Sequence, residues 1–295
     1  MSKEKKKIII ILGATATGKS NLAVKIAKKL GGEIISADSR QVYKSLDIGT
    51  GKITKKEMRG VEHHLLDVVS PKKIFTVSEY QKITNSAIAE IVTKGKIPII
   101  CGGTGFYIDA ITKNIIFPEV PPNKKLRKIL EKQSAEKLFK TLEKLDKFRA
   151  KDILNKNEHN NKVRLIRAIE IAQHLGKVPH LEARPPSYEF IKIGLQLEQN
   201  TLKQKIEKRV KKMFDKGLLK EIENLEKTGI DKKRFKELGF EYFEPTYEKV
   251  VNETIKYSKR QKTYFKRDKE INWFKPTEYK KILAFLSSYV WNNHR

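Results

Sequence analysis

Residues 13–20 read Gly-Ala-Thr-Ala-Thr-Gly-Lys-Ser, and this spacing of glycines, lysine and serine suits the binding of phosphate groups. Glycines let the backbone wrap an anion with its N–H groups, and the start of a following helix adds a partial positive charge of roughly +0.5 e. In such a loop Lys19 neutralises phosphate oxygens and Ser20 holds Mg²⁺. We therefore predict that these residues form a phosphate-binding loop, and the alternative is a coincidental glycine-rich turn. The predicted loop consists of Gly13, Ala14, Thr15, Ala16, Thr17, Gly18, Lys19 and Ser20.

The segments on either side of this loop favour the phosphate-binding interpretation. Ile8–Leu12 consists of four isoleucines and a leucine, which is typical of a strand buried on both faces. Lys19–Leu30 predicts a helix that begins where the loop ends. The glycines would therefore lie between a buried strand and a helix N-terminus, as a phosphate loop requires.

A nucleotide hydrolase of this kind also needs a carboxylate at the end of a neighbouring apolar strand. The best candidate strand, Lys96–Cys101, is followed by Gly102-Gly-Thr-Gly and not by an acid. Asp38 or Asp67 could substitute from other strands. The sequence therefore predicts phosphate binding without predicting nucleotide hydrolysis.

Asp38 directly follows the apolar segment Glu33–Ala37. Open α/β sheets place groups that contact ligands at the carboxyl ends of their strands. A carboxylate in this position can act as a base or as a metal ligand, whereas the alternative is that Asp38 caps a helix. The residues alone leave these interpretations open.

Strands and helices alternate along the first part of the chain, since Thr76–Thr93 has helical periodicity between the strands at 33–37 and 96–101. This order predicts a parallel sheet with right-handed crossovers. Prolines then bound a Lys/Glu/Leu-rich helical stretch, and strand-like alternation returns at 191–197. We predict a core of residues 1–117 and 187–295 interrupted by an inserted helical domain, 118–186.

The composition is that of a soluble globular protein, with 39% hydrophobic and 33% charged residues. The net charge of +28 indicates a polyanionic partner, although a general lysine-rich composition is the alternative. The single cysteine, Cys101, excludes a disulfide framework or a cysteine metal site within one chain, and it fits a reducing compartment. The apolar run Ile8–Leu12 is too short for a signal peptide or a membrane span.

Several motifs occur together in an order that is more specific than any one of them. In this combination the chain resembles the tRNA dimethylallyltransferase family, bacterial type, over nearly its whole length. The motifs are residues 13–20, Ser36–Tyr43, His63–Asp67, Gly102–Tyr107, Asn161–Glu170, Arg209–Met213 with Gly217–Leu219, and Lys259–Arg267.

The resemblance implies a P-loop NTPase-like α/β fold, with a parallel sheet core and an inserted, mostly helical tRNA-binding domain. It implies Mg²⁺-dependent transfer of a dimethylallyl group from dimethylallyl diphosphate to N6 of the adenosine 3′ of the anticodon in tRNA, releasing pyrophosphate. A diphosphate leaving group needs no activated water, which would explain the strand that ends without an acid. We expect a cytoplasmic monomer that does not bind membranes.

Roles for individual residues also follow from the resemblance. Lys19 and the loop amides would bind the diphosphate, Ser20 would contact Mg²⁺, and Arg209 would neutralise the departing pyrophosphate. Asp38 matches the family aspartate that takes the proton of the adenine amino group. Residues that match tRNA-contacting positions are Asp38, Ser39, Arg40, Gln41, Thr104, Val163, Arg164, Leu165, Ile166 and Arg167. A solvated helix face explains Arg164 and Arg167 equally well without the resemblance.

The basic segment Lys256–Lys269 is interleaved with aromatic residues, a pattern that suits RNA with splayed bases. On a helix, Arg260 and Arg267 would lie near one face, and the aromatic side chains could instead belong to the core. The turn within Phe235–Tyr242 matches the family only loosely, because Phe240 stands where a tyrosine is usual. Remaining alternatives are a free-nucleotide prenyltransferase, a small-molecule P-loop kinase, and an RNA-binding module with a vestigial loop.

Overall fold

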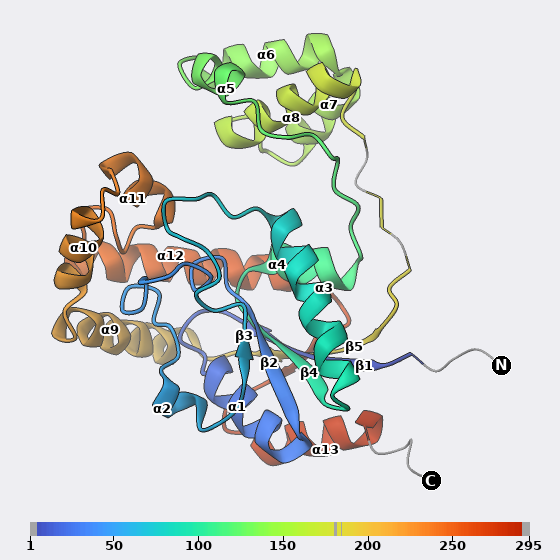
Figure 1. Cartoon of the computed structure of the whole chain (residues 1–295), viewed down its shortest axis with the longest axis vertical. Helices are drawn as coiled ribbons and strands as arrows, with labels where there is room; N and C mark the ends of the chain where they lie inside the picture. Colours follow the sequence, from blue (N-terminus) through green and yellow to red (C-terminus); the bar gives the residue numbers. More distant parts are fainter. Residues whose placement is uncertain (1–4, 180–181, 184, 291–295) are drawn as a thin grey trace. The chain divides into compact units, whose positions relative to one another are not determined.

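The computed structural model describes residues 5–179, 182–183 and 185–290. The chain divides into two compact units (Figure 1). The larger unit runs to Asn114 and resumes at Pro185, and the smaller unit begins at Ile115. The boundaries expected from the sequence, 118 and 186, lie within a few residues of these positions.

Within the residues that the structure describes, the strands belong to the larger unit and the smaller unit is helical. The strands are β1 (Lys7–Gly13), β2 (Gly32–Ala37), β3 (His63–His64), β4 (Ile97–Gly102), β5 (Glu189–Leu195) and β6 (Asn272–Phe274). The helices of the larger unit are α1 (Lys19–Leu30), α2 (Lys55–Met58), α3 (Val77–Thr93), α4 (Gly105–Thr112), α9 (Gln199–Asp215), α10 (Leu218–Lys227), α11 (Lys232–Leu238), α12 (Tyr247–Phe265) and α13 (Tyr279–Val290). The helices of the smaller unit are α5 (Lys124–Leu130), α6 (Ala135–Leu145), α7 (Lys147–Asn155) and α8 (Lys162–Leu175).

The six strands form one sheet in the order β3-β2-β4-β1-β5-β6, and every neighbouring pair is parallel. This confirms the predicted α/β fold with a parallel sheet. β1 lies between β4 and β5, with Ile10 paired to Ile100 on one side and to Lys192 on the other. After the inserted unit the chain therefore returns to the interior of the sheet as β5, next to the strand that precedes the phosphate loop.

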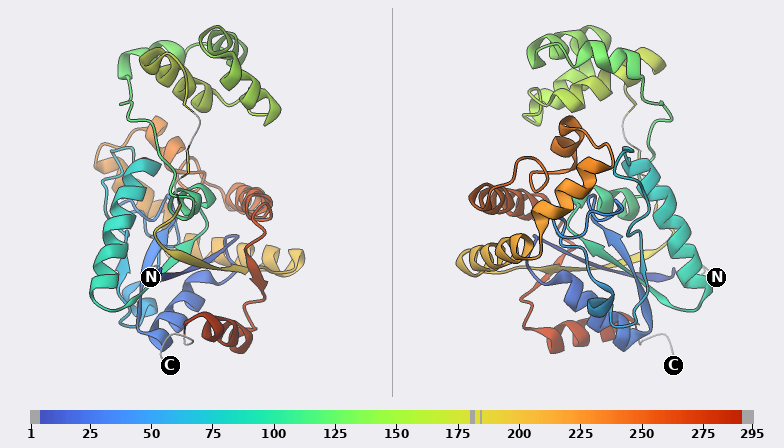
Figure 2. Two further views of the ribbon diagram at one scale, coloured as in Figure 1. Left: turned by 90° about the vertical axis from the view of Figure 1, so that its right-hand side faces the viewer. Right: turned by 60° about the vertical axis from the view of Figure 1, so that its left-hand side comes forward.

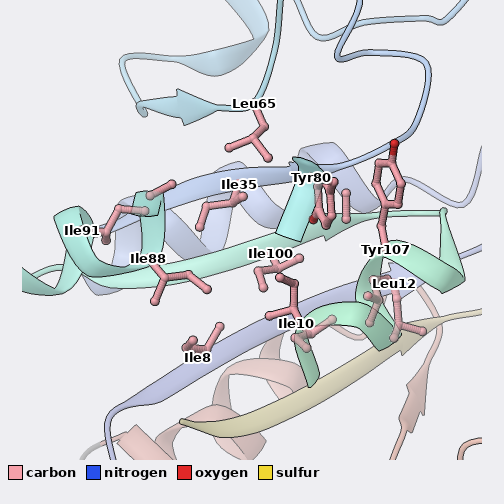
Figure 3. Packing of buried hydrophobic residues seen from close by; sticks show 14 of the residues in the cluster. Ile8, Ile10, Leu12, Ile35, Leu65, Tyr80, Ile88, Ile91, Ile100 and Tyr107 are labelled. Carbon is pink, nitrogen blue, oxygen red and sulfur yellow. The ribbon is translucent and has the colours of Figure 1, made fainter. Parts of the chain in front are cut away.

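Alternate residues of β1 enter two different hydrophobic clusters, as expected for a strand covered on both faces. Ile8, Ile10 and Leu12 pack toward α3 and α4, and Figure 3 shows this cluster from close by. Ile9 and Ile11 pack toward α1 and α13 on the opposite face. Ile8 to Ile11 are fully buried, and each such side chain stabilises the fold by about 1.5–3 kcal/mol.

Two further helices pack beside one another next to the sheet. In both views of Figure 2, α9 and α12 run as neighbours in the larger unit. Ile206 and Val210 of α9 meet Val250 and Val251 of α12, and Ala16 of the phosphate loop packs against the same cluster. This contact fixes the position of α9 relative to the phosphate loop.

The smaller unit has a hydrophobic core of its own. The side chains that fill it come from α5, α6, α7 and α8, and include Leu138, Leu142, Ile153, Leu165 and Ile169. The two chain segments that enter and leave this unit meet as an antiparallel bridge, where Ile116 N donates to Glu182 O at 2.9 Å. Across the described part of the chain, no helix combines the length and apolar character that spanning a membrane requires.

Candidate active site

The phosphate loop depends on glycine at both of its ends. Gly13 has a φ of 139°, and a Cβ there would lie 2.4 Å from the carbonyl oxygen of Leu195 in β5. Gly18 has a φ of 94° and is the N-cap of α1, with no side chain capping the helix. The N-terminal turn of α1 therefore presents its N–H groups and its partial positive charge without a competing side-chain acceptor.

Hydrogen bonds within the loop hold its shape. Ala14 O accepts from Thr17 Oγ1 at 2.8 Å and from Lys19 Nζ at 2.7 Å. Burial lowers the pKa of Lys19 to about 8, an effect that Asp38 opposes and Arg209 reinforces. A desolvated ammonium close to a second cation is stabilised strongly by an incoming anion.

Gln261 of α12 connects the phosphate loop to the end of β4. Its Oε1 accepts from Thr15 N at 2.8 Å, and its Nε2 donates to Gly103 O at 2.9 Å. Gln261 is 6% exposed, so both bonds are protected from water. Gln261 lies within the motif Lys259–Arg267, but its role could not be predicted from the sequence, because both of its partners lie far away along the chain.

Asp38 follows β2, and its carboxylate holds a turn instead of capping a helix. Oδ1 accepts from Arg40 N at 2.9 Å and from Gln41 N at 3.4 Å. Within the described residues, Oδ2 accepts no hydrogen bond, and Asp38 is partly exposed to the cavity described below. The structural role of one oxygen therefore leaves the second oxygen available for a ligand.

Thr104 and Ser39 lie behind Asp38 and connect two strand ends. Thr104 N donates to Ala37 O at 3.1 Å, and Thr104 Oγ1 accepts from Ser39 N at 3.0 Å. The Tyr257 hydroxyl lies near Thr104, and burial raises the pKa of Tyr257 to about 12. These contacts fix the backbone on which Asp38 is mounted.

Arg209 of α9 points into the same region as Lys19 and Asp38. Its Nη2 donates to Thr50 O at 2.8 Å. Gly51 makes room for it, since a Cβ on Gly51 would lie 2.2 Å from Nη2. Burial lowers the pKa of Arg209, and the nearby carboxylates of Asp38 and Glu241 oppose that shift.

Glu221 of α10 holds the loop of residues 47–51, whose Thr50 carbonyl accepts the hydrogen bond from Arg209. Glu221 Oε2 accepts from the amides of Asp47 and Ile48, at 3.0 and 2.7 Å. Oε1 accepts from Gly49 N at 3.1 Å and from the Tyr242 hydroxyl at 2.8 Å. Glu221 is therefore a positioning residue, because it holds the loop that contacts Arg209. No local sequence pattern predicted this role.

The turn within Phe235–Tyr242 also reaches this region. Gly239 has a φ of 150°, and a Cβ there would lie 1.6 Å from Nη1 of Arg40. Glu241 Oε2 lies 3.8 Å from Nη1 of Arg40. Burial raises the pKa of Glu241, although Arg40 and Arg209 act in the opposite direction.

These elements enclose one cavity of about 750 Å³ in the larger unit. Nine Lys and Arg residues line it against four Asp and Glu, so it favours anions. Five of the predicted site residues in the larger unit do not line the cavity and instead support the residues that line it. They are Gly13, Ala14, Thr17, Ser39 and Thr104. The predicted residues that the structure brings together on its wall are Thr15, Ala16, Gly18, Lys19, Ser20, Asp38, Arg40, Gln41 and Arg209.

The other strip that we expected to contact tRNA lies at the start of α8 in the smaller unit. Val163 is 80% exposed, whereas Leu165 and Ile166 are buried in the hydrophobic core of that unit. Arg164 pairs with Glu158, and Arg167 Nη2 donates to Val120 O at 2.8 Å. The side chains of Leu165 and Ile166 pack α8 into the core of the smaller unit and are not exposed at the surface of that unit.

The basic segment Lys256–Lys269 forms the second half of α12 and the turn that follows. The expectation that Arg260 and Arg267 share a helix face is wrong, because α12 ends at Phe265. Phe265 is buried in the core, and the Tyr264 hydroxyl donates to Asp109 Oδ2 at 2.7 Å. Of the three aromatic residues, Tyr257 lines the cavity and the other two pack into the protein.

The parallel sheet and the strand–loop–helix unit define the class, an α/β protein with a P-loop NTPase-like fold. The IPP transferase family matches residues 41–268. A tRNA dimethylallyltransferase of Acetivibrio thermocellus is 38% identical over 307 aligned positions, covering 96% of this chain and 97% of that protein. One from Carboxydothermus hydrogenoformans is 40% identical, with 91% of each chain covered. This chain therefore belongs to the IPP transferase family, whose members include tRNA dimethylallyltransferases.

Solved structures show the same relationship. The tRNA isopentenylpyrophosphate transferase of Bacillus halodurans is 31% identical, with a TM-score of 0.70 and coverage of 97% of this chain and 96% of that chain. A eukaryotic dimethylallyltransferase acting on tRNA is 24% identical, with a TM-score of 0.81 over 97% of this chain and 80% of that chain, and shows the shared fold.

Proposed function

We propose that this chain transfers a dimethylallyl group from dimethylallyl diphosphate to N6 of the adenosine 3′ of the anticodon in tRNA, releasing pyrophosphate. The observation that carries the proposal is one cavity lined by Lys19 and Arg209, which suit a diphosphate, and by Asp38, which suits an amino group. The family membership and the names of the relatives support the same activity.

The reaction is a substitution at the allylic C1 carbon of the diphosphate. The lone pair of N6 forms the new C–N bond, while the C1–O bond breaks and its electron pair leaves with pyrophosphate. The proton lost from N6 moves to Asp38, whose Oδ2 accepts no other hydrogen bond among the described residues. Asp38 is thus the general base of the proposed mechanism.

Charge develops on the leaving diphosphate as the C1–O bond breaks. Lys19, Arg209 and the N-terminal N–H groups of α1 would stabilise this charge, and their positions are already fixed by hydrogen bonds. Ser20 fits a Mg²⁺ site, because its exposed hydroxyl lines the cavity and Mg²⁺ takes oxygen ligands while keeping several waters. Bound Mg²⁺ would supply further charge neutralisation on the diphosphate.

The helical unit would bind the tRNA substrate. Its residues include 17 Lys and Arg against nine Asp and Glu, which suits a phosphate backbone. The target base would leave its stack to meet the allylic carbon inside the cavity, since chemistry on a stacked base is obstructed. The proposed enzyme works as a monomer in the cytoplasm.

The direct test incubates the purified protein with Mg²⁺, dimethylallyl diphosphate and unmodified tRNA, followed by nucleoside mass spectrometry. We expect one adenosine per substrate tRNA to gain the mass of a dimethylallyl group, with pyrophosphate released and no nucleoside triphosphate required. AMP in place of tRNA is the matched control and should stay unmodified. Unchanged tRNA nucleosides would contradict the proposal, and efficient prenylation of AMP would favour a free-nucleotide prenyltransferase.

A further inference from the structure

Helix α9 carries four lysines on one face and at its C-terminal end. Lys205, Lys208, Lys212 and Lys216 follow one another at intervals of three, four and four residues, which places them in line along a helix. All four are exposed. We call this set the lysine stripe.

The lysine stripe faces the cavity of the candidate active site. All four lysines line that cavity together with Ser20 and Arg209. The orientation of α9 is fixed by Ile206 and Val210, whose side chains belong to the cluster against which Ala16 of the phosphate loop packs. At 100° per residue, Arg209 projects between this buried face and the lysine stripe. The stripe therefore extends the positive charge of Arg209 from the cavity toward solvent.

The lysine stripe lacks matching acids. None of its four ammonium groups forms an ion pair within the described part of the chain. Glu57 is close enough to attract Lys212 and Lys216, but its carboxylate accepts from Thr54 N and Oγ1 at 2.9 and 2.8 Å. Like charges four residues apart destabilise a helix. An anion that binds along the stripe would remove this repulsion.

We propose that the lysine stripe captures the diphosphate group of the small substrate and holds pyrophosphate on its way out. The inference rests on the proposed function, because dimethylallyl diphosphate supplies the anion. Lys19 and Arg209 lie inside the cavity, whereas the stripe lies at its exposed rim. A rim of one charge sign raises the local concentration of an oppositely charged ligand and speeds its association, and salt weakens the effect.

The test compares two double variants of the full-length protein. Lys208→Gln/Lys212→Gln removes two charges from the stripe, and Lys203→Gln/Lys211→Gln removes two charges of α9 that do not line the cavity. For the stripe variant we expect the KM for dimethylallyl diphosphate to rise about tenfold, with kcat and the KM for tRNA within about twofold. Its kcat/KM for the diphosphate should also depend less steeply on salt than that of wild type. The control variant should match wild type in all of these measurements.

Calorimetric titration with inorganic pyrophosphate gives a readout that does not require turnover. We expect affinity about tenfold weaker in the stripe variant and unchanged in the control. Equal behaviour of the two variants would overturn the proposal, and so would a stripe variant whose KM rises for tRNA alone, which would mark the stripe as an RNA contact. If wild type modifies no tRNA, the proposed function fails, while the pyrophosphate comparison still tests the stripe.

Discussion

At the scale of single residues, Asp38 has two roles that belong to its two oxygens. Oδ1 accepts from the amides of Arg40 and Gln41 and holds the turn after β2, so replacing the whole side chain would disturb both roles. Asn keeps an acceptor oxygen for the turn but cannot take a proton at neutral pH. The substitution Asp38→Asn therefore separates the structural role from the proposed chemical role.

We predict that Asp38→Asn lowers kcat by about 10²–10⁴-fold, the usual contribution of a general base, while the dissociation constant for tRNA stays within about twofold. Single-turnover kinetics and a filter-binding titration measure these two quantities. Turnover equal to that of wild type would remove Asp38 from the role of base.

Lys19 provides a second test at this scale, because burial lowers its pKa to about 8. The charged form of Lys19 binds phosphate. The affinity for pyrophosphate should therefore have its full value below pH 8 and should fall by up to about tenfold per pH unit above pH 8. Arginine stays charged throughout this range. The ratio of wild-type to Lys19→Arg affinity, measured by calorimetry from pH 6.5 to 9.5, should therefore decline above pH 8. A ratio that is constant with pH would contradict the assignment.

At the scale of secondary structure, the amino ends of the strands are held by a charged cluster far from the cavity residues. Glu33 of β2 is 1% exposed, and it accepts from Lys96 at 2.6 Å, His64 at 2.7 Å and Lys94 at 3.4 Å. Glu33, Glu62 and His64 lie close enough to hold a metal ion, but the two lysines already neutralise Glu33. The cluster therefore connects β2, β3 and the end of α3.

The pH dependence of this cluster has a defined sign. Burial alone would raise the pKa of Glu33, but hydrogen bonds from Lys96, His64 and Lys94 outweigh it and lower the pKa from 4.5 to about 2. A lowered carboxyl pKa contributes stability above pH 4.5 that is lost as the pH falls through 2. We predict that Glu33→Gln costs about 1–3 kcal/mol at pH 7, and that its difference from wild type narrows between pH 4.5 and 2.

Urea denaturation across this pH range measures the effect. Glu90→Gln is the matched control, because Glu90 pairs with the same Lys94 on the surface and its loss should leave stability nearly unchanged. Equal destabilisation by the two substitutions would show that Glu33 has no special role.

The elements that the sequence predicted are those with long, regular patterns. β1, β2, β4, α1 and α3 follow from apolar runs and helical periodicity, and β5 follows from alternation after the insertion. β3 and β6 were not predicted, because segments of two and three residues carry no periodicity and exist through pairing with β2 and β5. The roles of Gln261 and Glu221 were missed for a related reason, since each bonds to backbone more than 150 positions away and no local pattern encodes such contacts.

At the scale of the whole molecule, the net charge of +28 is shared between the two units. The helical unit has its own hydrophobic core, and an antiparallel bridge between Ile115 and Ala183 joins the two segments by which the chain enters and leaves it. The hydrophobic clusters around the sheet consist of residues from the larger unit. Each unit therefore contains the packing that it needs, so the insertion can be removed without opening the core that holds the phosphate loop.

We predict that replacing residues 115–184 with a short Gly/Ser linker leaves pyrophosphate affinity within about threefold of wild type, because the cavity is lined only by the larger unit. Affinity for tRNA should fall at least about tenfold, and the slope of log affinity against log salt should become shallower because fewer phosphate counterions are released. Calorimetry with pyrophosphate and filter binding of tRNA at several salt concentrations measure both quantities on the same protein. If the variant binds pyrophosphate normally and tRNA with unchanged affinity and salt slope, the larger unit alone carries the RNA surface and the insertion has another role.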